Sequence, residues 1–242
     1  MRFFVLEHPK TGYDDALTDF LSAPGTKRGD APRCPKCGSA IGSLVTLPPI
    51  RVELETWGKR FGDLVFGVGN AVLVCERFKD EFLRSGLTGF FGFTPPEIVK
   101  VIARRGRIPK PMPNYFYAIP GRSRAAIDDN ASEVEYERPW TCEECRGNYK
   151  RRFQRVALEP NTWSGEDVFI ARGLPGTIIT SERFKQFCDR HAFSNCLLTE
   201  AERYHVDSLP WSRGPAPLSP TQRAIMAARP GGATARNGRD SR

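Results

Sequence analysis

Hydrophobic and polar positions alternate with a helical period in two segments, residues 76–86 (ERFKDEFLRSG) and 181–192 (SERFKQFCDRHA). In each segment two apolar side chains stand four positions apart, so they share one face of a helix. These pairs are Phe78 with Phe82, and Phe184 with Cys188. Ser181 is a typical N-cap, and Gly86 is a typical residue just beyond a helix end. We therefore predict two amphipathic helices.

Short runs rich in β-branched and aromatic residues flank both helices and predict strands. They are residues 71–75 (AVLVC) and 87–94 (LTGFFGFT) around the first helix, and 176–180 (GTIIT) and 193–199 (FSNCLLT) around the second. Further extended segments are predicted at 43–55 and 151–159. The glycine-spaced GDLVFGVGNAV (62–72) matches no phosphate-binding loop, and we interpret it as a flexible turn. The pattern as a whole predicts an α+β fold.

The two helices belong to a longer repeat. The tetrapeptide ERFK begins at residue 76 and again at residue 182, 106 residues later. Other matches follow in the same order with offsets of 104 to 108: Cys34 with Cys142, Arg51-Val52 with Arg155-Val156, Trp57 with Trp163, and Asp63 with Asp167. Ordered self-similarity of this kind predicts two related α+β halves.

Composition divides the chain into four parts. Residues 1–103 form the first half and residues 140–207 the second. Between them, residues 104–139 are rich in Pro, Gly and charged residues, so we interpret them as a connecting segment with one extended piece, NYFYAI. Residues 208–242 are rich in Pro, Gly, Ala and Arg and predict a disordered tail, because they hold too few apolar residues to form a core.

Charge and hydropathy narrow the classes of partner. The net charge is +8, but the tail carries six Arg and one Asp, so the remaining chain is only mildly basic. A passive solvated tail is the favoured interpretation and a functional basic arm the alternative. The sequence has no run of 18 apolar residues, so it predicts no membrane-spanning helix. The first residues of the sequence lack the pattern of a signal peptide. We therefore expect a cytoplasmic protein without a membrane partner, and the sequence indicates no oligomeric state.

Two CxxC turns open the two halves, CPKCGS at residues 34–39 and CEECRG at residues 142–147. Each turn places two sulfurs close together, and zinc prefers four ligands in a tetrahedron. The prediction is one structural zinc ion shared between the halves, with four ligands: Cys34, Cys37, Cys142 and Cys145. Free thiols or a labile disulfide remain an alternative, as does a thioredoxin-type redox pair. Gly38 suits a turn that needs positive φ, whereas Arg146 stands in the matching place and predicts a differently shaped second turn.

The remaining polar candidates have ordinary structural interpretations. The other cysteines, Cys75, Cys188 and Cys196, align with Ser or Phe in the repeat, so we interpret them as capping or packing residues. Asp63 and Asp167 are interpreted as loop caps, Glu76 and Glu182 as charges that suit a helix N-terminus, and Trp57 and Trp163 as loop anchors. No GxSxG, HExxH or Walker motif is present. We therefore expect a protein that is not an enzyme.

These motifs resemble a known family. A CPxCG turn, a second CxxC about a hundred residues later and the segment DVFIARGLPGTIITSERFKQF (167–187) resemble the double-CxxCG immunity proteins of myxobacteria, over residues 2–207. Arg146 departs from the family pattern, which has Gly after the second Cys. The resemblance implies a non-enzymatic antidote that binds and neutralises a cognate protein toxin delivered between cells.

A zinc-ribbon nucleic-acid-binding protein is the alternative function. It would use a basic face with interleaved aromatic residues, and residues 104–124 offer Arg and Lys around Tyr115, Phe116 and Tyr117. Steeply salt-dependent binding to DNA or RNA would distinguish it from an antidote. A zinc hydrolase needs an open metal position, and four cysteine ligands leave none.

Overall fold

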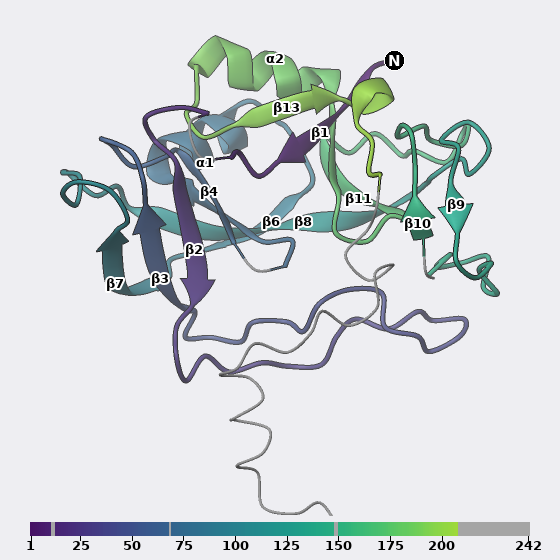
Figure 1. Ribbon diagram of the computed structural model, residues 1–242, viewed down its shortest axis with the longest axis horizontal. Coiled ribbons are helices and arrows are strands. Elements are labelled where there is room, and N and C mark those ends of the chain that lie inside the picture. The colour runs from purple at the N-terminus through teal and green to yellow at the C-terminus, as the bar shows by residue number, and fades with distance from the viewer. Residues whose placement is uncertain (11–12, 68, 148–149, 208–242) are drawn as a thin grey trace, which may run out of the picture.

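A long mixed β-sheet with two helices on one side forms the body of the protein (Figure 1). The computed structural model describes residues 1–10, 13–67, 69–147 and 150–207. The predicted disordered tail, residues 208–242, lies outside these ranges. In the described ranges no helix is long and apolar enough to cross a membrane.

The described chain is mostly β-sheet with two α-helices, a mixed α+β fold as predicted. The helices are α1 (Glu76–Arg84) and α2 (Glu182–His191), with a short 3₁₀ helix η1 (Ala201–Arg203). The strands are β1 (Phe3–Glu7), β2 (Thr18–Ser22), β3 (Arg51–Thr56), β4 (Leu64–Gly67), β5 (Val72–Cys75), β6 (Phe90–Thr94), β7 (Glu97–Ala103), β8 (Tyr115–Ala126), β9 (Glu135–Tyr136), β10 (Lys150–Arg152), β11 (Val168–Arg172), β12 (Ile178–Ser181) and β13 (Leu197–Glu200).

The large sheet runs in the order β13-β1-β12-β11-β8-β5-β4-β2-β3-β7, and β6 also pairs with β8. Strand β1 pairs antiparallel with both β12 and β13, and β8 pairs antiparallel with both β5 and β6. Strands β9 and β10 form a separate two-stranded sheet. Elements far apart in the sequence are thus joined side by side, and the sheet connects the two ends of the described chain.

Both helices begin where the sequence predicted. The Cys75 Sγ accepts a hydrogen bond from the Phe78 N–H at 3.4 Å, and the Ser181 Oγ accepts one from the Phe184 N–H at 3.2 Å. Each helix carries a glutamate in its first turn, where a negative charge favours the helix dipole. Gly86 follows α1 with a φ of +68°, as a helix-ending glycine does.

The apolar faces of α1 and α2 meet each other over the sheet. Phe78 and Phe184 are fully buried, and their ring centroids lie 6.2 Å apart. Phe82, Phe187 and Phe193 extend the same aromatic cluster. A second, smaller apolar cluster around Ile127, Phe153, Phe169 and Ile179 lies elsewhere in the fold. The first cluster fixes the positions of both helices.

The segment 104–139, interpreted from sequence as a connection, contains the longest strand of the sheet. The predicted extended piece NYFYAI lies at the start of β8, which continues to Ala126. Its first part pairs with β5 (Val72 opposite Ala118), and its second part pairs with β11 (Phe169 opposite Gly121). The pairing partner changes near Pro120, where a missing N–H donor is tolerated.

Other extended segments differ from the sequence predictions. The interpretation of GDLVFGVGNAV as a flexible turn is wrong for residues 64–67, which form the buried strand β4. Of the predicted extended segment 43–55 only residues 51–55 form a strand, as part of β3, because Pro48 and Pro49 lack the N–H donors that a strand needs. Residues 23–50 instead form a long arm that lies below the sheet, on the side away from the helices (Figure 1).

Candidate metal centre

The four predicted cysteine ligands lie together, although two come from the arm and two from the segment between β9 and β10. Their sulfur atoms all lie within 4.8 Å of one another. The Cys34 and Cys142 sulfurs are 3.9 Å apart, and those of Cys37 and Cys145 are 3.7 Å apart. A tetrahedron with zinc–sulfur bonds of about 2.3 Å has edges of about 3.8 Å. The two sulfur–sulfur distances match such edges, and the set is close enough to hold a metal ion.

Burial distinguishes the four sulfur ligands. Cys34 and Cys142 are buried, Cys145 is half-buried and Cys37 is exposed. A site with one exposed corner can take up an ion without opening the sheet. Its buried side ties the arm to the second half of the chain.

The two CxxC turns have the same backbone shape, so the prediction of a differently shaped second turn is wrong. The Gly38 N–H donates to the Cys34 carbonyl at 2.9 Å, and the Arg146 N–H donates to the Cys142 carbonyl at 2.8 Å. Both residues have positive φ, +73° at Gly38 and +47° at Arg146. Arg146 thus occupies a left-handed conformation that costs a non-glycine residue about 1–2 kcal/mol.

The side chain of Arg146 offsets this strain. Its guanidinium donates to both carboxylate oxygens of Glu159, at 2.7 and 3.0 Å, and to the Ile127 carbonyl at 2.9 Å. It also lies over the Trp140 ring, 5.4 Å from the centroid. A bidentate arginine–carboxylate pair is among the stronger polar contacts in proteins. The residue therefore clamps the second turn to Glu159 and to the backbone just after β8, which a glycine side chain cannot do.

Replacing Arg146 by Ala is expected to lower the free energy of unfolding by about 2–3 kcal/mol, because the charge-assisted hydrogen bonds are lost while the strain remains. Arg146→Gly loses the same contacts but relieves the strain, so it should be about 1 kcal/mol less harmful than the Ala variant. Urea unfolding measures both values. Equal effects of Ala and Gly would contradict the strained conformation.

The thiols of the site do not ionise alike. Hydrogen bonding from the Ser39 side chain and backbone lowers the pKa of Cys37 to about 6. Burial raises the pKa of Cys145 to about 12. Of these two thiols, Cys37 at the exposed corner is therefore the one that favours the thiolate form. A divalent ion would favour loss of the proton from Cys145 as well.

Asp63 and Asp167 act as loop caps, in agreement with the sequence interpretation. The Asp63 carboxylate accepts hydrogen bonds from the Ser194 N–H at 2.9 Å and hydroxyl at 2.8 Å. The Asp167 carboxylate accepts a hydrogen bond from the Thr88 N–H at 3.0 Å. Burial alone would raise the pKa of Asp63, but hydrogen bonds from Ser194 and Cys75 lower it below its usual value. Each aspartate thus fixes the loop that follows the other helix.

The other three cysteines have the environments of structural residues. Cys75 caps α1, and burial raises the pKa of its thiol to about 12. Burial also raises the pKa of Cys188, and Cys196 packs against the main apolar cluster. Trp163 packs edge-to-face on Phe3 with a centroid distance of 5.3 Å. A reactive thiol needs a lowered pKa, and neither Cys75 nor Cys188 has one.

Sequence reasoning missed the supports of the metal centre. Ser39 and Glu159 hold Cys37 and Arg146, respectively; Ser39 closes the CPKCGS stretch but was given no role, and Glu159 lies outside both CxxC turns. The only signal was the departure from Gly at Arg146, since a non-glycine residue at a left-handed position needs compensating contacts.

Comparison of the sequence with protein-family models finds no match, and comparison with curated proteins finds none either.

Proposed function

We propose that the four cysteines hold one zinc ion and that the chain is an immunity protein, which neutralises a bacterial toxin by binding it. The observation that carries the proposal is the double CxxC arrangement, in which sulfurs from turns 108 residues apart form one compact set. Thiolate donors in a tetrahedral set favour zinc. Four protein ligands fill its coordination, so the ion has a structural role and leaves no open position for substrate.

The proposal includes an internal duplication of the chain. Corresponding hairpins have corresponding registers: Leu64 faces Val74 between β4 and β5, and Val168 faces Thr180 between β11 and β12. The strands after the helices also correspond, since Phe91 faces Ile119 and Leu197 faces Glu7. Leu64 with Val168, Val74 with Thr180 and Phe91 with Leu197 keep the offsets of 104 and 106 residues that the sequence repeat has, whereas Glu7 and Ile119 lie 112 residues apart.

Contacts between the halves support the same relationship. Asp63 binds Ser194 while Asp167 binds Thr88, which are reciprocal contacts at equivalent positions. Equivalent residues also meet each other, Cys34 with Cys142 and Phe78 with Phe184. Such contacts are those of a two-fold symmetric dimer. In this proposal the second half begins with β8 and not at residue 140, so β1 and β8 are equivalent strands: β1 pairs with β12 and β13, and β8 pairs with β5 and β6.

This arrangement suits a protein that acts by binding. Exchanged strands and a shared ion keep the two halves from moving apart, so a partner meets a surface that is already ordered. A preformed surface lowers the entropic cost of association and favours tight binding. The proposal therefore assigns the protein a rigid scaffold for a protein interface and no chemistry of its own.

The nucleic-acid alternative has less support. A nucleic-acid-binding face would need exposed aromatic rings that stack on bases, but Tyr115 and Tyr117 are buried in the sheet. Tyr115 donates its hydroxyl to the Gly62 carbonyl at 2.7 Å. Stacking platforms for single strands need exposed rings.

Co-expression with the toxin encoded beside the gene is expected to rescue growth, and purified protein should bind that toxin in a one-to-one complex that tolerates salt. Cys196→Ser should rescue equally, since that thiol packs against the core and takes no part in binding. Protection at far below one copy per toxin molecule would indicate catalysis and overturn the proposal. Steeply salt-dependent binding to DNA or RNA would favour the alternative instead.

A further inference from the structure

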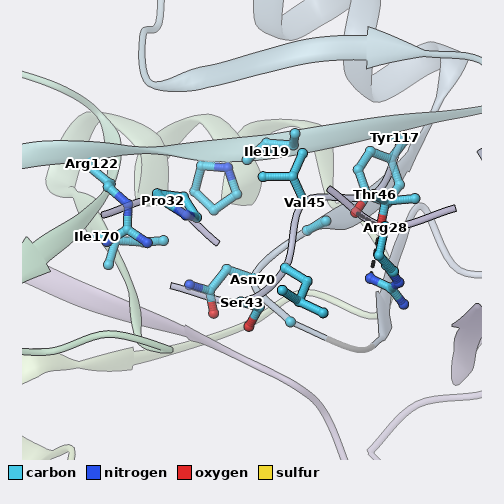
Figure 2. A pocket seen from close by; sticks show the side chains of 14 residues that line it. Arg28, Pro32, Ser43, Val45, Thr46, Asn70, Tyr117, Ile119, Arg122 and Ile170 are labelled. Atoms are coloured by element: carbon cyan, nitrogen blue, oxygen red, sulfur yellow. Dashed lines mark hydrogen bonds between the residues drawn. The ribbon is translucent and has the colours of Figure 1, made fainter. Parts of the chain in front are cut away.

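A cavity of about 420 Å³ lies between the arm and the sheet (Figure 2). The arm contributes residues on either side of the first CxxC turn, and the sheet contributes the middle of β8 and part of β11. Small-molecule sites typically have volumes of about 300–1,000 Å³. The cavity is therefore large enough for a small organic molecule or the end of a peptide.

The lining combines positive charge with apolar surface. Arg122 and Arg28 lie at opposite ends of the cavity, and Val45 and Ile119 lie between them (Figure 2). Hydroxyl and amide groups of Ser43, Thr46, Tyr117 and Asn70 complete the polar part of the wall. None of the residues that line the cavity is an aspartate or glutamate. The cavity is therefore electropositive with an apolar middle.

The two guanidinium groups differ in what they bind. The Arg28 Nη1 donates to the Thr46 hydroxyl at 2.9 Å, and the same side chain also binds Ser22. These bonds hold the arm against itself and against the end of β2. Within the described ranges the Arg122 guanidinium forms neither a hydrogen bond nor an ion pair with a protein group. Burial lowers the pKa of Arg122, and no neighbouring carboxylate offsets that effect.

Gly42 leaves space for the Arg122 guanidinium. A Cβ at position 42 would lie 2.0 Å from Arg122 Nη2 and 3.2 Å from its Cζ. The backbone of Gly42 has no positive φ, so alanine could adopt its conformation. The absence of a side chain at this position thus leaves room for the guanidinium where it lies, lining this cavity and a neighbouring one.

We propose that this cavity binds an organic acid, with its carboxylate on Arg122 and its apolar part against Val45 and Ile119. A carboxylate accepts two parallel hydrogen bonds from a guanidinium, and such charge-assisted bonds are strong when partly shielded from water. The apolar stem of the ligand then covers side chains that water would otherwise contact. The same chemistry is found in a free organic acid and in the carboxyl end of a peptide with an apolar last residue. This inference does not depend on toxin neutralisation.

Calorimetric titration of the full-length protein with 4-phenylbutyrate and with its amide tests the proposal. The acid is expected to bind, and the amide at least about tenfold more weakly, because the amide lacks the charge that pairs with the guanidinium. A peptide ending in leucine, with a free or an amidated carboxyl group, forms the second arm. Binding of the acid alone would indicate a free organic acid as the ligand, and selective binding of the free peptide end would indicate a chain terminus.

Three variants locate the site. Arg122→Gln should weaken binding of the preferred acid at least about tenfold through loss of the charged pair. Gly42→Ala should also weaken it, since the new methyl group displaces the guanidinium while the charge is retained. Arg124→Gln is the matched control, because Arg124 lines a neighbouring cavity of about 320 Å³ and not this one. Equal binding of acid and amide, full binding by Arg122→Gln in a folded protein, or no binding of any probe would overturn the proposal.

Discussion

Replacing Cys142 by Ser is expected to release the zinc ion proposed for the four cysteines and to destabilise the whole fold. Three thiolates hold zinc less tightly than four, and ligand binding to the native state adds to its stability in proportion to the logarithm of the affinity. For an ion present at a thousand times its dissociation constant, that contribution is about 4 kcal/mol. Because Cys142 is buried against Cys34, its loss also separates the arm from the second half of the chain.

Elemental analysis and urea unfolding measure this effect. The wild-type protein purified without chelator should hold one zinc ion per chain, and a chelator should lower its free energy of unfolding by about as much as Cys142→Ser does. Cys196→Ser is the matched control, since Cys196 packs against the core outside the cysteine set. A well-folded wild-type protein that holds far less than one ion per chain would contradict the prediction.

Acid should weaken the metal site in a defined direction. Metal ligation needs thiolates, so protons compete with the ion and the affinity falls as the pH falls. The pKa values of two thiols in the site, Cys37 and Cys145, are shifted. Of these two, Cys37 keeps its negative charge to the lower pH, because its pKa is lowered to about 6. Metal release is therefore expected on acidification, and zinc content measured across a pH series follows it.

Local signals explain why the helices and the metal ligands were predictable. Helix α1 begins one residue after Cys75, and α2 begins one residue after Ser181, because capping and the four-residue spacing of apolar residues act within a single turn. The four cysteines could be grouped because each CxxC turn supplies two sulfurs and zinc prefers four ligands. Spacing within a turn and order along the chain were sufficient for these predictions.

The sheet was less predictable because its pairings are not local. Strand β1 lies between β12 and β13, which follow it by more than 170 residues, and no local pattern indicates such partners. Strand β8 contains Pro120 and Gly121, which usually argue against a sheet interior. Strand β4 is a short run buried on both sides, so it shows no alternation. The arm and its cavity likewise depend on tertiary contacts that composition does not show.

Truncation of the aromatic core is the second large effect expected. Phe78 and Phe184 have no exposed surface, so Phe78→Ala and Phe184→Ala should each lower the free energy of unfolding by about 3–5 kcal/mol. Both side chains occupy the contact between α1 and α2, and if the two halves are related the two substitutions should have similar effects. Leu83→Ala is the control, because Leu83 lies on the solvent-facing side of the same helix α1 and is 60% exposed. This substitution should change the free energy of unfolding by less than about 0.5 kcal/mol.

The double variant tests whether the two helices form one core. Because the rings lie 6.2 Å apart and share neighbours, removing both should cost less than the sum of the single effects, with a coupling of about 0.5–3 kcal/mol. A double variant this unstable needs its unfolding measured in the presence of a stabilising osmolyte, with both single variants under the same conditions. Strictly additive effects would mean that each phenylalanine stabilises its own half separately. Sub-additive effects would mean that α1 and α2 fold as a single cooperative unit, as their shared aromatic cluster requires.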